Sequence, residues 1–235
     1  MNPFDRGLIL WLNQFADRSR IFDGLVVLLS QTELLKGGVA LAVIWWLWFS
    51  TRDDSRVLRE RLLATLAGGA VAALASRLLS DVLPFRTRPF HEPRLPFHPP
   101  FTESVNMLRN FSSFPSDHAS LFTALSVGVL FCSRRAGIFL LFWTLVVVLM
   151  PRLYLGLHYP TDILAGAALA TLTACALQTR RVREGLSAPL LDWKDRHPSS
   201  FYAALYLASL QIAVLFGDLR DILSFLVVSF RSGAR

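Results

Sequence analysis

The stretch that decides the fold runs from residue 110 to 162, where two polar clusters enclose a long apolar segment. It opens with FPSDHAS at 114–120 and closes with PRLYLGLHYPTD at 151–162, and the charged residues between them are confined to the turn CSRRAG at 132–137. An apolar segment that crosses a bilayer, turns and crosses back returns its two ends to the same side of the membrane. We therefore expect the two clusters to meet and to bring together two histidines, an arginine, an aspartate and a serine.

The composition indicates a membrane protein built from α-helices. Of the 235 residues, 53% are hydrophobic and 17% are charged, with a mean hydropathy of +0.45. A soluble domain carries about 25% charged and about 45–50% apolar residues, and here the apolar excess is gathered in long runs. We therefore expect an all-α, polytopic membrane helical bundle that forms a single domain over 1–235. The charged residues among the first 20 positions are not typical of a cleavable signal peptide.

The apolar runs predict about six membrane spans. Their ranges are 34–49, 62–83, 116–132, 138–151, 161–177 and 201–216. Two shorter segments within 1–31 (4–15 and 21–30) predict amphipathic helices that lie at the membrane interface. An extra helical region is expected at 200–235, in which 222–230 is too short to span. Whether 201–217 crosses the bilayer completely is left open.

The distribution of arginine predicts which end of the bundle faces the cytoplasm. The connections 51–61, 133–135 and 179–200 are rich in Arg and fall on one side, and we expect all three to be loops. The connection 84–115 falls on the other side with both polar clusters, and it holds too many prolines for a regular helix. We therefore expect a multi-pass protein of the cytoplasmic (inner) membrane with its site facing the periplasm or cell exterior. The net charge of +7 is attributed to the cytoplasmic loops rather than to nucleic-acid binding.

The second polar cluster holds residues suited to acid–base or nucleophilic chemistry. Arg152 precedes His158, and Asp162 follows this histidine by four residues at the start of a predicted helix. A carboxylate at one imidazole nitrogen fixes the tautomer and raises the basicity of the other nitrogen. His158 is then a candidate nucleophile or base, although a His–Asp pair at this spacing also occurs as a purely structural pair.

The first cluster and the end of the second span add groups that bind anions. Ser116, Asp117 and His118 open the third span, where the first backbone N–H groups of a helix are unpaired and can hold an anion. Arg86 and Arg88 follow the second span on the same side, and guanidinium groups bind phosphate oxygens in a bidentate manner. Together these residues suggest phosphoryl transfer, in which arginines neutralise the phosphate oxygens, one histidine attacks and the other protonates the leaving oxygen.

Three motifs, in this order, resemble the signatures of the type 2 phosphatidic acid phosphatase superfamily. They are RP at 88–89, PSDH at 115–118 and the spaced Arg, His and Asp of 152–162, and the resemblance covers about residues 60–180, the expected phosphatase core. It implies a helical bundle and metal-independent hydrolysis through a phosphohistidine intermediate. It also implies roles for His158 as the nucleophile, Asp162 as its orienting carboxylate and His118 as the acid for the leaving group. The phosphate-binding groups that it implies are Arg88, Arg152, Ser116 and the backbone N–H of Asp117.

The sequence departs from the superfamily pattern at three positions. Asp81 stands where the first signature has Lys, and Arg77 or Arg86 is the candidate replacement cation. Asp117 replaces the Gly of the second signature, which keeps the backbone donor but adds a carboxylate near the phosphate. Pro151 replaces the Ser that begins the third signature and so removes a hydroxyl.

The expected substrate is a lipid phosphate in the bilayer. The chain resembles compact bacterial phosphatases of undecaprenyl diphosphate, which makes this carrier lipid the first choice. The alternatives are a phosphatidate or phosphatidylglycerophosphate phosphatase, a lipid phosphotransferase and a non-enzymatic transporter of anionic lipid. The five histidines show no HExxH pattern, and we expect neither a metal nor another cofactor. The oligomeric state is not indicated.

Overall fold

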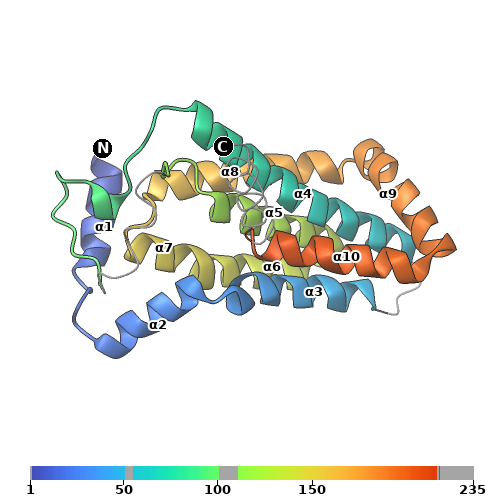
Figure 1. Ribbon diagram of the computed structural model, residues 1–235, viewed down its shortest axis with the longest axis horizontal. Helices are drawn as coiled ribbons and strands as arrows, with labels where there is room; N and C mark the ends of the chain where they lie inside the picture. The colour runs from blue at the N-terminus through green and yellow to red at the C-terminus, as the bar shows by residue number, and fades with distance from the viewer. Residues whose placement is uncertain (1, 51–54, 101–110, 216, 218–235) are drawn as a thin grey trace, which may run out of the picture.

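The computed structural model describes residues 2–50, 55–100, 111–215 and 217, and this part of the chain is helical, without a strand (Figure 1). In chain order the elements are α1 (Pro3–Asn13), α2 (Arg20–Gln31), η1 (Leu34–Gly38), α3 (Val39–Trp48), α4 (Ser55–Val82), η2 (Pro89–His91), α5 (Asp117–Cys132), α6 (Arg134–Trp143), η5 (Thr144–Leu149), α7 (Met150–Tyr154), α8 (Pro160–Gln178), α9 (Arg180–Arg196) and α10 (Pro198–Ala213). The expected all-α architecture is confirmed.

The centre of the bundle is α5, which packs against both α4 and α8. Small residues let these three helices approach closely. Gly69 on α4 makes room for Leu125 of α5, and Ala72, Ala124 and Ala170 form a buried cluster to which each of the three helices contributes one residue. The close packing fixes the start of α5 relative to the start of α8, which is where the two polar clusters lie.

Within the part of the chain that the structure describes, three helices are long and apolar enough to cross a membrane: 56–82, 134–154 and 160–178. The second of these is one continuous helix that contains the π-helical segment η5 between α6 and α7. A fourth candidate is formed by α2 together with η1 and α3, which are bent by 68° at the break between them. Helix α5 is apolar but shorter. The count of about six spans stays a prediction, and residues 222–230 lie outside the described residues.

The two short N-terminal segments are helices, as predicted. Each begins at a side-chain cap, Asn2 for α1 and Ser19 for α2. Each also buries an aspartate, Asp5 at 0% and Asp23 at 1% exposed, which a helix lying only on a membrane surface would leave in water. Figure 1 shows α1 beside the connection that follows α4, at one end of the bundle. The N-terminal helices are therefore packed against the rest of the protein through polar contacts.

The prediction of a basic loop at 179–200 is wrong, because most of this segment is helix α9. Its arginines favour a helix as readily as a loop. Its apolar side chains lie on one face, where Leu191 is buried and Leu186, Leu190 and Trp193 pack against the core. In the described parts of 84–115 no element longer than the three-residue turn η2 occurs, as the prolines predicted.

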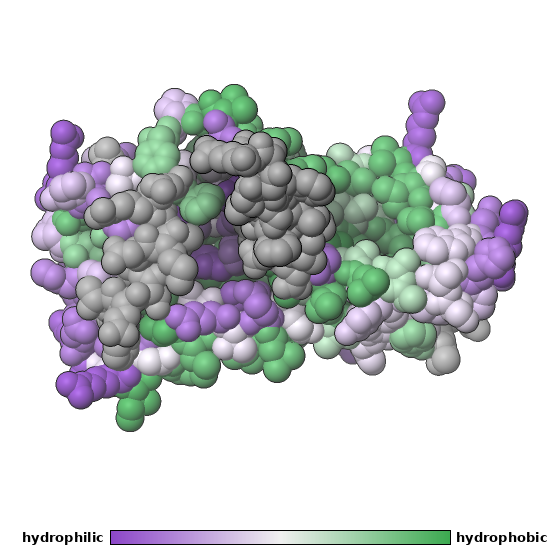
Figure 2. All heavy atoms as spheres, viewed as in Figure 1, coloured by the Kyte–Doolittle hydropathy of each residue, from purple (hydrophilic) through white to green (hydrophobic). Residues whose placement is uncertain are grey.

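The hydrophilic side chains gather at the two ends of the bundle (Figure 2). Figure 1 places α9 at one end, and α1 with the connection after α4 at the other. This distribution is the one expected for a bundle that crosses a bilayer along its long axis.

Candidate active site

The two polar clusters meet around a cavity of about 150 Å³. The residues lining it are Arg77, Arg88, Phe111, Asp117, His118, Arg152, Leu157, His158 and Leu215. A backbone hydrogen bond ties the clusters together, because the N–H of Ser116 donates to the carbonyl of Asp162 over 3.1 Å. Three of the lining residues are arginines, so the cavity is suited to an anion.

His158 lies in the connection between α7 and α8 and is 3% exposed. Its Nδ1 is 2.8 Å from the carbonyl oxygen of Ser113, which can only accept, so Nδ1 carries the proton. The other ring nitrogen, Nε2, lies 3.4 Å from Nη1 of Arg88 at the cavity. Burial lowers the pKa of His158, an effect that the neighbouring Asp162 partly opposes. The imidazole is therefore held neutral, and its Nε2 accepts a long hydrogen bond from Nη1 of Arg88.

Asp162 is completely buried in the first turn of α8. Its Oδ2 accepts the backbone N–H of Tyr159 over 2.7 Å and lies 3.8 Å from Nδ1 of His158. The carboxylate is thus close enough for an electrostatic interaction, while the direct hydrogen bond of Nδ1 goes to Ser113. Sequence reasoning missed Ser113 because its contribution is a backbone carbonyl, which side-chain identity does not reveal.

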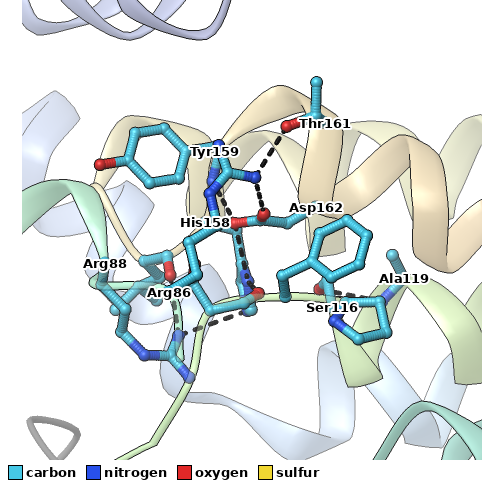
Figure 3. Close-up of polar contacts among 12 residues, drawn as sticks. Arg86, Arg88, Ser116, Ala119, His158, Tyr159, Thr161 and Asp162 are labelled. Atoms are coloured by element: carbon cyan, nitrogen blue, oxygen red, sulfur yellow. Dashed lines mark hydrogen bonds and ion pairs between the residues drawn. The ribbon is translucent and has the colours of Figure 1, made fainter. Parts of the chain in front are cut away.

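Arg86 is not among the residues lining the cavity, although the sequence suggested that it binds phosphate. Its guanidinium is paired with both Asp162 and Asp5, and its Nη1 donates to Oγ1 of Thr161 over 2.8 Å (Figure 3). It also stacks on the ring of Tyr159 at 4.2 Å. Two completely buried carboxylates require a positive partner, and Arg86 supplies it.

Arg77 lines the cavity, whereas Arg86, the other candidate replacement for the missing Lys of the first signature, does not. Its guanidinium lies 4.6 Å from the ring centre of Phe111. Asp81, one helical turn further along α4, is exposed. Helix α4 therefore contributes a cation to the cavity at Arg77, one turn before the position of the missing Lys.

The other two cavity arginines differ in how they are held. Arg88 is fixed by carbonyl oxygens, with Nη1 donating to Leu157 over 2.7 Å and Nε to Phe111 over 3.3 Å. Burial lowers the pKa of Arg88, which still leaves it charged at neutral pH. Arg152 is 6% exposed, and its Nε is buried with no hydrogen-bond partner among the described residues. A buried guanidinium N–H without a partner is costly, and Arg152 also lines the cavity.

Ser116, Asp117 and His118 form the start of α5. Ser116 caps the helix by accepting the N–H of Ala119 over 3.4 Å, and it does not line the cavity. Oδ1 of Asp117 accepts from Nδ1 of His118 over 2.8 Å, which leaves Nε2 as the ring nitrogen not engaged by the carboxylate. Both Asp117 and His118 line the cavity. The carboxylate that replaces the usual Gly thus becomes a partner of the second histidine.

Comparison with known families agrees with these motifs. Residues 70–184, just under half of the chain, match the PAP2 superfamily. Together with the candidate membrane spans, this match makes the chain similar to multi-pass membrane proteins of the PAP2 superfamily. Asp5 and the whole N-terminal segment lie outside the matched region.

The individual proteins that match this chain have low sequence identity to it. The undecaprenyl-diphosphatase BcrC of Bacillus subtilis (strain 168) is 26% identical over 168 residues, which cover 68% of this chain and 76% of that protein. The bacitracin transport permease protein BcrC of Bacillus licheniformis is 28% identical over 139 residues, or 56% of this chain and 59% of that protein. The crystal structure of a transmembrane PAP2-type phosphatidylglycerolphosphate phosphatase from Bacillus subtilis matches with 21% identity and a TM-score of 0.47, covering 74% of this chain and 82% of that one.

Proposed function

We propose that the protein hydrolyses the terminal phosphate of undecaprenyl diphosphate through a phosphohistidine on His158. The observation that carries this proposal is a cavity lined by both His158 and Arg152, whose buried Nε has no hydrogen-bond partner among the described residues. A neutral imidazole beside Arg88 supplies a nucleophile, and the arginines lining the cavity supply positive charge for the phosphoryl oxygens.

In the first step, Nε2 of His158 attacks the terminal phosphorus, and the bond from phosphorus to the bridging oxygen breaks. His118 donates its Nε2 proton to that oxygen, which leaves as the lipid monophosphate. Arg77, Arg88 and Arg152 line the same cavity and neutralise the charge on the phosphoryl oxygens. The imidazolium formed on His158 is stabilised by Asp162 and by the carbonyl of Ser113.

In the second step, water attacks the phosphohistidine. His118, now neutral, takes a proton from this water, and inorganic phosphate leaves as the bond from phosphorus to Nε2 of His158 breaks. The resident side chains supply the nucleophile, the acid and the charge stabilisation, so we propose that the reaction needs no divalent metal.

The preference for a lipid diphosphate is supported by the relative named undecaprenyl-diphosphatase. We also propose that the cavity faces the outside of the cytoplasmic membrane. The end opposite the cavity carries the arginine-rich turn at 133–135 and helix α9, and arginine-rich connections favour the cytoplasmic side.

The test is phosphate release by the purified protein from undecaprenyl diphosphate, phosphatidate and phosphatidylglycerophosphate. We expect the diphosphate to be preferred and His158→Ala to abolish release while lipid binding persists. The matched control is His197→Ala, which removes a histidine after α9 at the far end of the bundle. Preference for a glycerolipid would replace the substrate assignment, and release by His158→Ala would remove the nucleophile. Binding without release by the folded wild type would favour a transporter.

A further inference from the structure

The carboxylate of Asp5 is completely buried, which is unusual for an acidic residue in a short amphipathic helix. Its Oδ2 accepts from Nη2 of Arg86 over 2.6 Å and from Oγ1 of Thr161 over 2.7 Å. Its Oδ1 accepts the backbone N–H of Thr161 over 3.0 Å, and Nδ2 of Asn2 donates to Oδ2 over 3.1 Å. A buried carboxylate is tolerated only when it is paired and hydrogen-bonded, and Asp5 meets both conditions.

The partners of Asp5 lead directly to the proposed nucleophile. Arg86 is paired with Asp5 and also with Asp162, the second of which Figure 3 shows. Asp162 in turn lies 3.8 Å from Nδ1 of His158. Thr161, which donates two hydrogen bonds to the Asp5 carboxylate, is the residue before Asp162 at the start of α8. The N-terminal helix is thus connected to the third signature through both an ion pair and the backbone.

The charges of this cluster give Asp5 a specific effect. With Asp5 present, one arginine is shared between two carboxylates, so the three side chains carry one net negative charge beside His158. Without the charge of Asp5, Arg86 would neutralise Asp162 alone, and this net charge would vanish. A negative charge beside the ring favours its positively charged form, which His158 adopts when it is phosphorylated.

We propose that Asp5 is a positioning residue of the active site, which acts through Arg86 to keep Asp162 oriented and able to stabilise the positively charged ring of His158. This inference rests on the proposed role of His158. It makes α1 part of the catalytic unit, although α1 lies outside the region that matches the superfamily.

Asp5 can be altered without detaching α1, because the helix has other anchors. Ile9 and Leu12 are buried in the core, and Asn13 exchanges two hydrogen bonds with the backbone of His98, at 2.8 and 2.9 Å. Asp5→Asn removes the charge and keeps the shape. Asn13→Ala is the matched control, since it weakens the docking of α1 and leaves the cluster untouched.

The experiment compares these two variants in kcat, KM, thermal stability and pH profile on the preferred lipid phosphate. We expect Asp5→Asn to lower kcat by at least about tenfold with KM nearly unchanged, because the lost interaction acts on the charged transition state. The acid limb of its kcat/KM profile should move to lower pH, since a less negative surrounding makes the ring harder to protonate. The other charged or titratable groups that share the cavity with the ring are unchanged in both variants: Arg77, Arg88, Asp117, His118 and Arg152.

A double-mutant cycle separates positioning from general loosening. If Asp5 acts through Asp162, adding Asp5→Asn to Asp162→Asn should reduce kcat much less than it does in the wild type. Full additivity would overturn the inference. So would a wild-type kcat and pH profile in Asp5→Asn, or a loss that Asn13→Ala reproduces with the same drop in melting temperature. If His158→Ala stays active, the proposed function has failed; if only Asp5→Asn behaves as wild type, this inference alone has failed.

Discussion

Replacing Gly166 by alanine should damage the active site by pushing α5 away from α8. A Cβ at Gly166 would lie 2.6 Å from the carbonyl oxygen of Ser116 and 3.0 Å from both the Cβ of Ala119 and the Oγ of Ser120. The Ser116 oxygen is part of the backbone and accepts the N–H of Ser120 over 3.0 Å, so it cannot rotate aside as a side chain would. The helices themselves must separate.

The size of the effect follows from this overlap. Non-bonded heavy atoms prefer a separation of about 3.5 Å or more, so the start of α5 must shift by up to about 1 Å. Overpacking of this kind costs about 1–3 kcal/mol, and the better helix propensity of alanine offsets about 0.5–1 kcal/mol of it. Asp117 and His118 follow Ser116 directly, so they would move relative to His158. A misplacement of about 1 Å can reduce a rate by about a hundredfold.

The matched control is Gly68→Ala on α4. A Cβ there would lie 3.8 Å from Cα of Ala174 and 4.0 Å from Cβ of Leu177, which is ordinary contact. The assay is phosphate release and thermal unfolding of both variants in the same detergent. We expect Gly166→Ala to lose about a hundredfold in kcat/KM and Gly68→Ala to retain its activity and its melting temperature. A Gly166→Ala protein with wild-type turnover and stability would refute the reasoning, as would equal losses in the two variants.

Four further predictions follow from the site. Burial lowers the pKa of His158, so its neutral form persists below pH of about 6.5 and the acid limb of kcat/KM should lie below that value; a limb above neutrality would contradict it. Arg77→Ala should weaken phosphate binding and lower kcat/KM by at least about tenfold, and an unchanged value would assign the missing Lys position to another cation. EDTA should leave phosphate release intact, and an absolute magnesium requirement would overturn the metal-free proposal. In a protein whose Cys132 and Cys175 are replaced, a cysteine at exposed Arg94 should react with an impermeant thiol reagent from outside intact cells, whereas labelling only after lysis would reverse the orientation.

The sequence predicts a helix correctly where the cause of the helix is local, as in a long apolar run. Long apolar runs such as 62–83 and 161–177 predict helices because a bilayer leaves backbone groups no other partner. Helix α9 was missed because its arginines and Pro189 resemble a loop, while its buried face is set by Leu191 and neighbours that pack on distant helices. Packing against distant helices determines the structure of this segment, and the pattern of neighbouring residues does not reveal that packing.

The same distinction between local motifs and long-range packing applies to the active site. The residues that come together at the cavity lie in compact motifs, so their meeting could be expected from the crossing of 116–151 alone. The role of Arg86 could not, because its partner Asp5 stands 81 positions away and looks like an ordinary acidic residue in the first turn of a helix. Only the structure distinguishes an arginine aimed at a substrate from one that holds two buried carboxylates.

Both histidines are oriented by an oxygen atom at Nδ1. The oxygen belongs to a different kind of group in each case, which agrees with their proposed roles. Each has Nδ1 against an oxygen, which directs Nε2 to the reaction: His158 against the neutral carbonyl of Ser113, His118 against the carboxylate of Asp117. A directly bonded carboxylate favours a positive ring, which a proton donor needs, more than a neutral carbonyl does. The Asp117 departure from the superfamily pattern therefore strengthens the division of labour between the histidines. One oxygen of the Asp117 carboxylate is engaged by His118, and the three cavity arginines offset its negative charge.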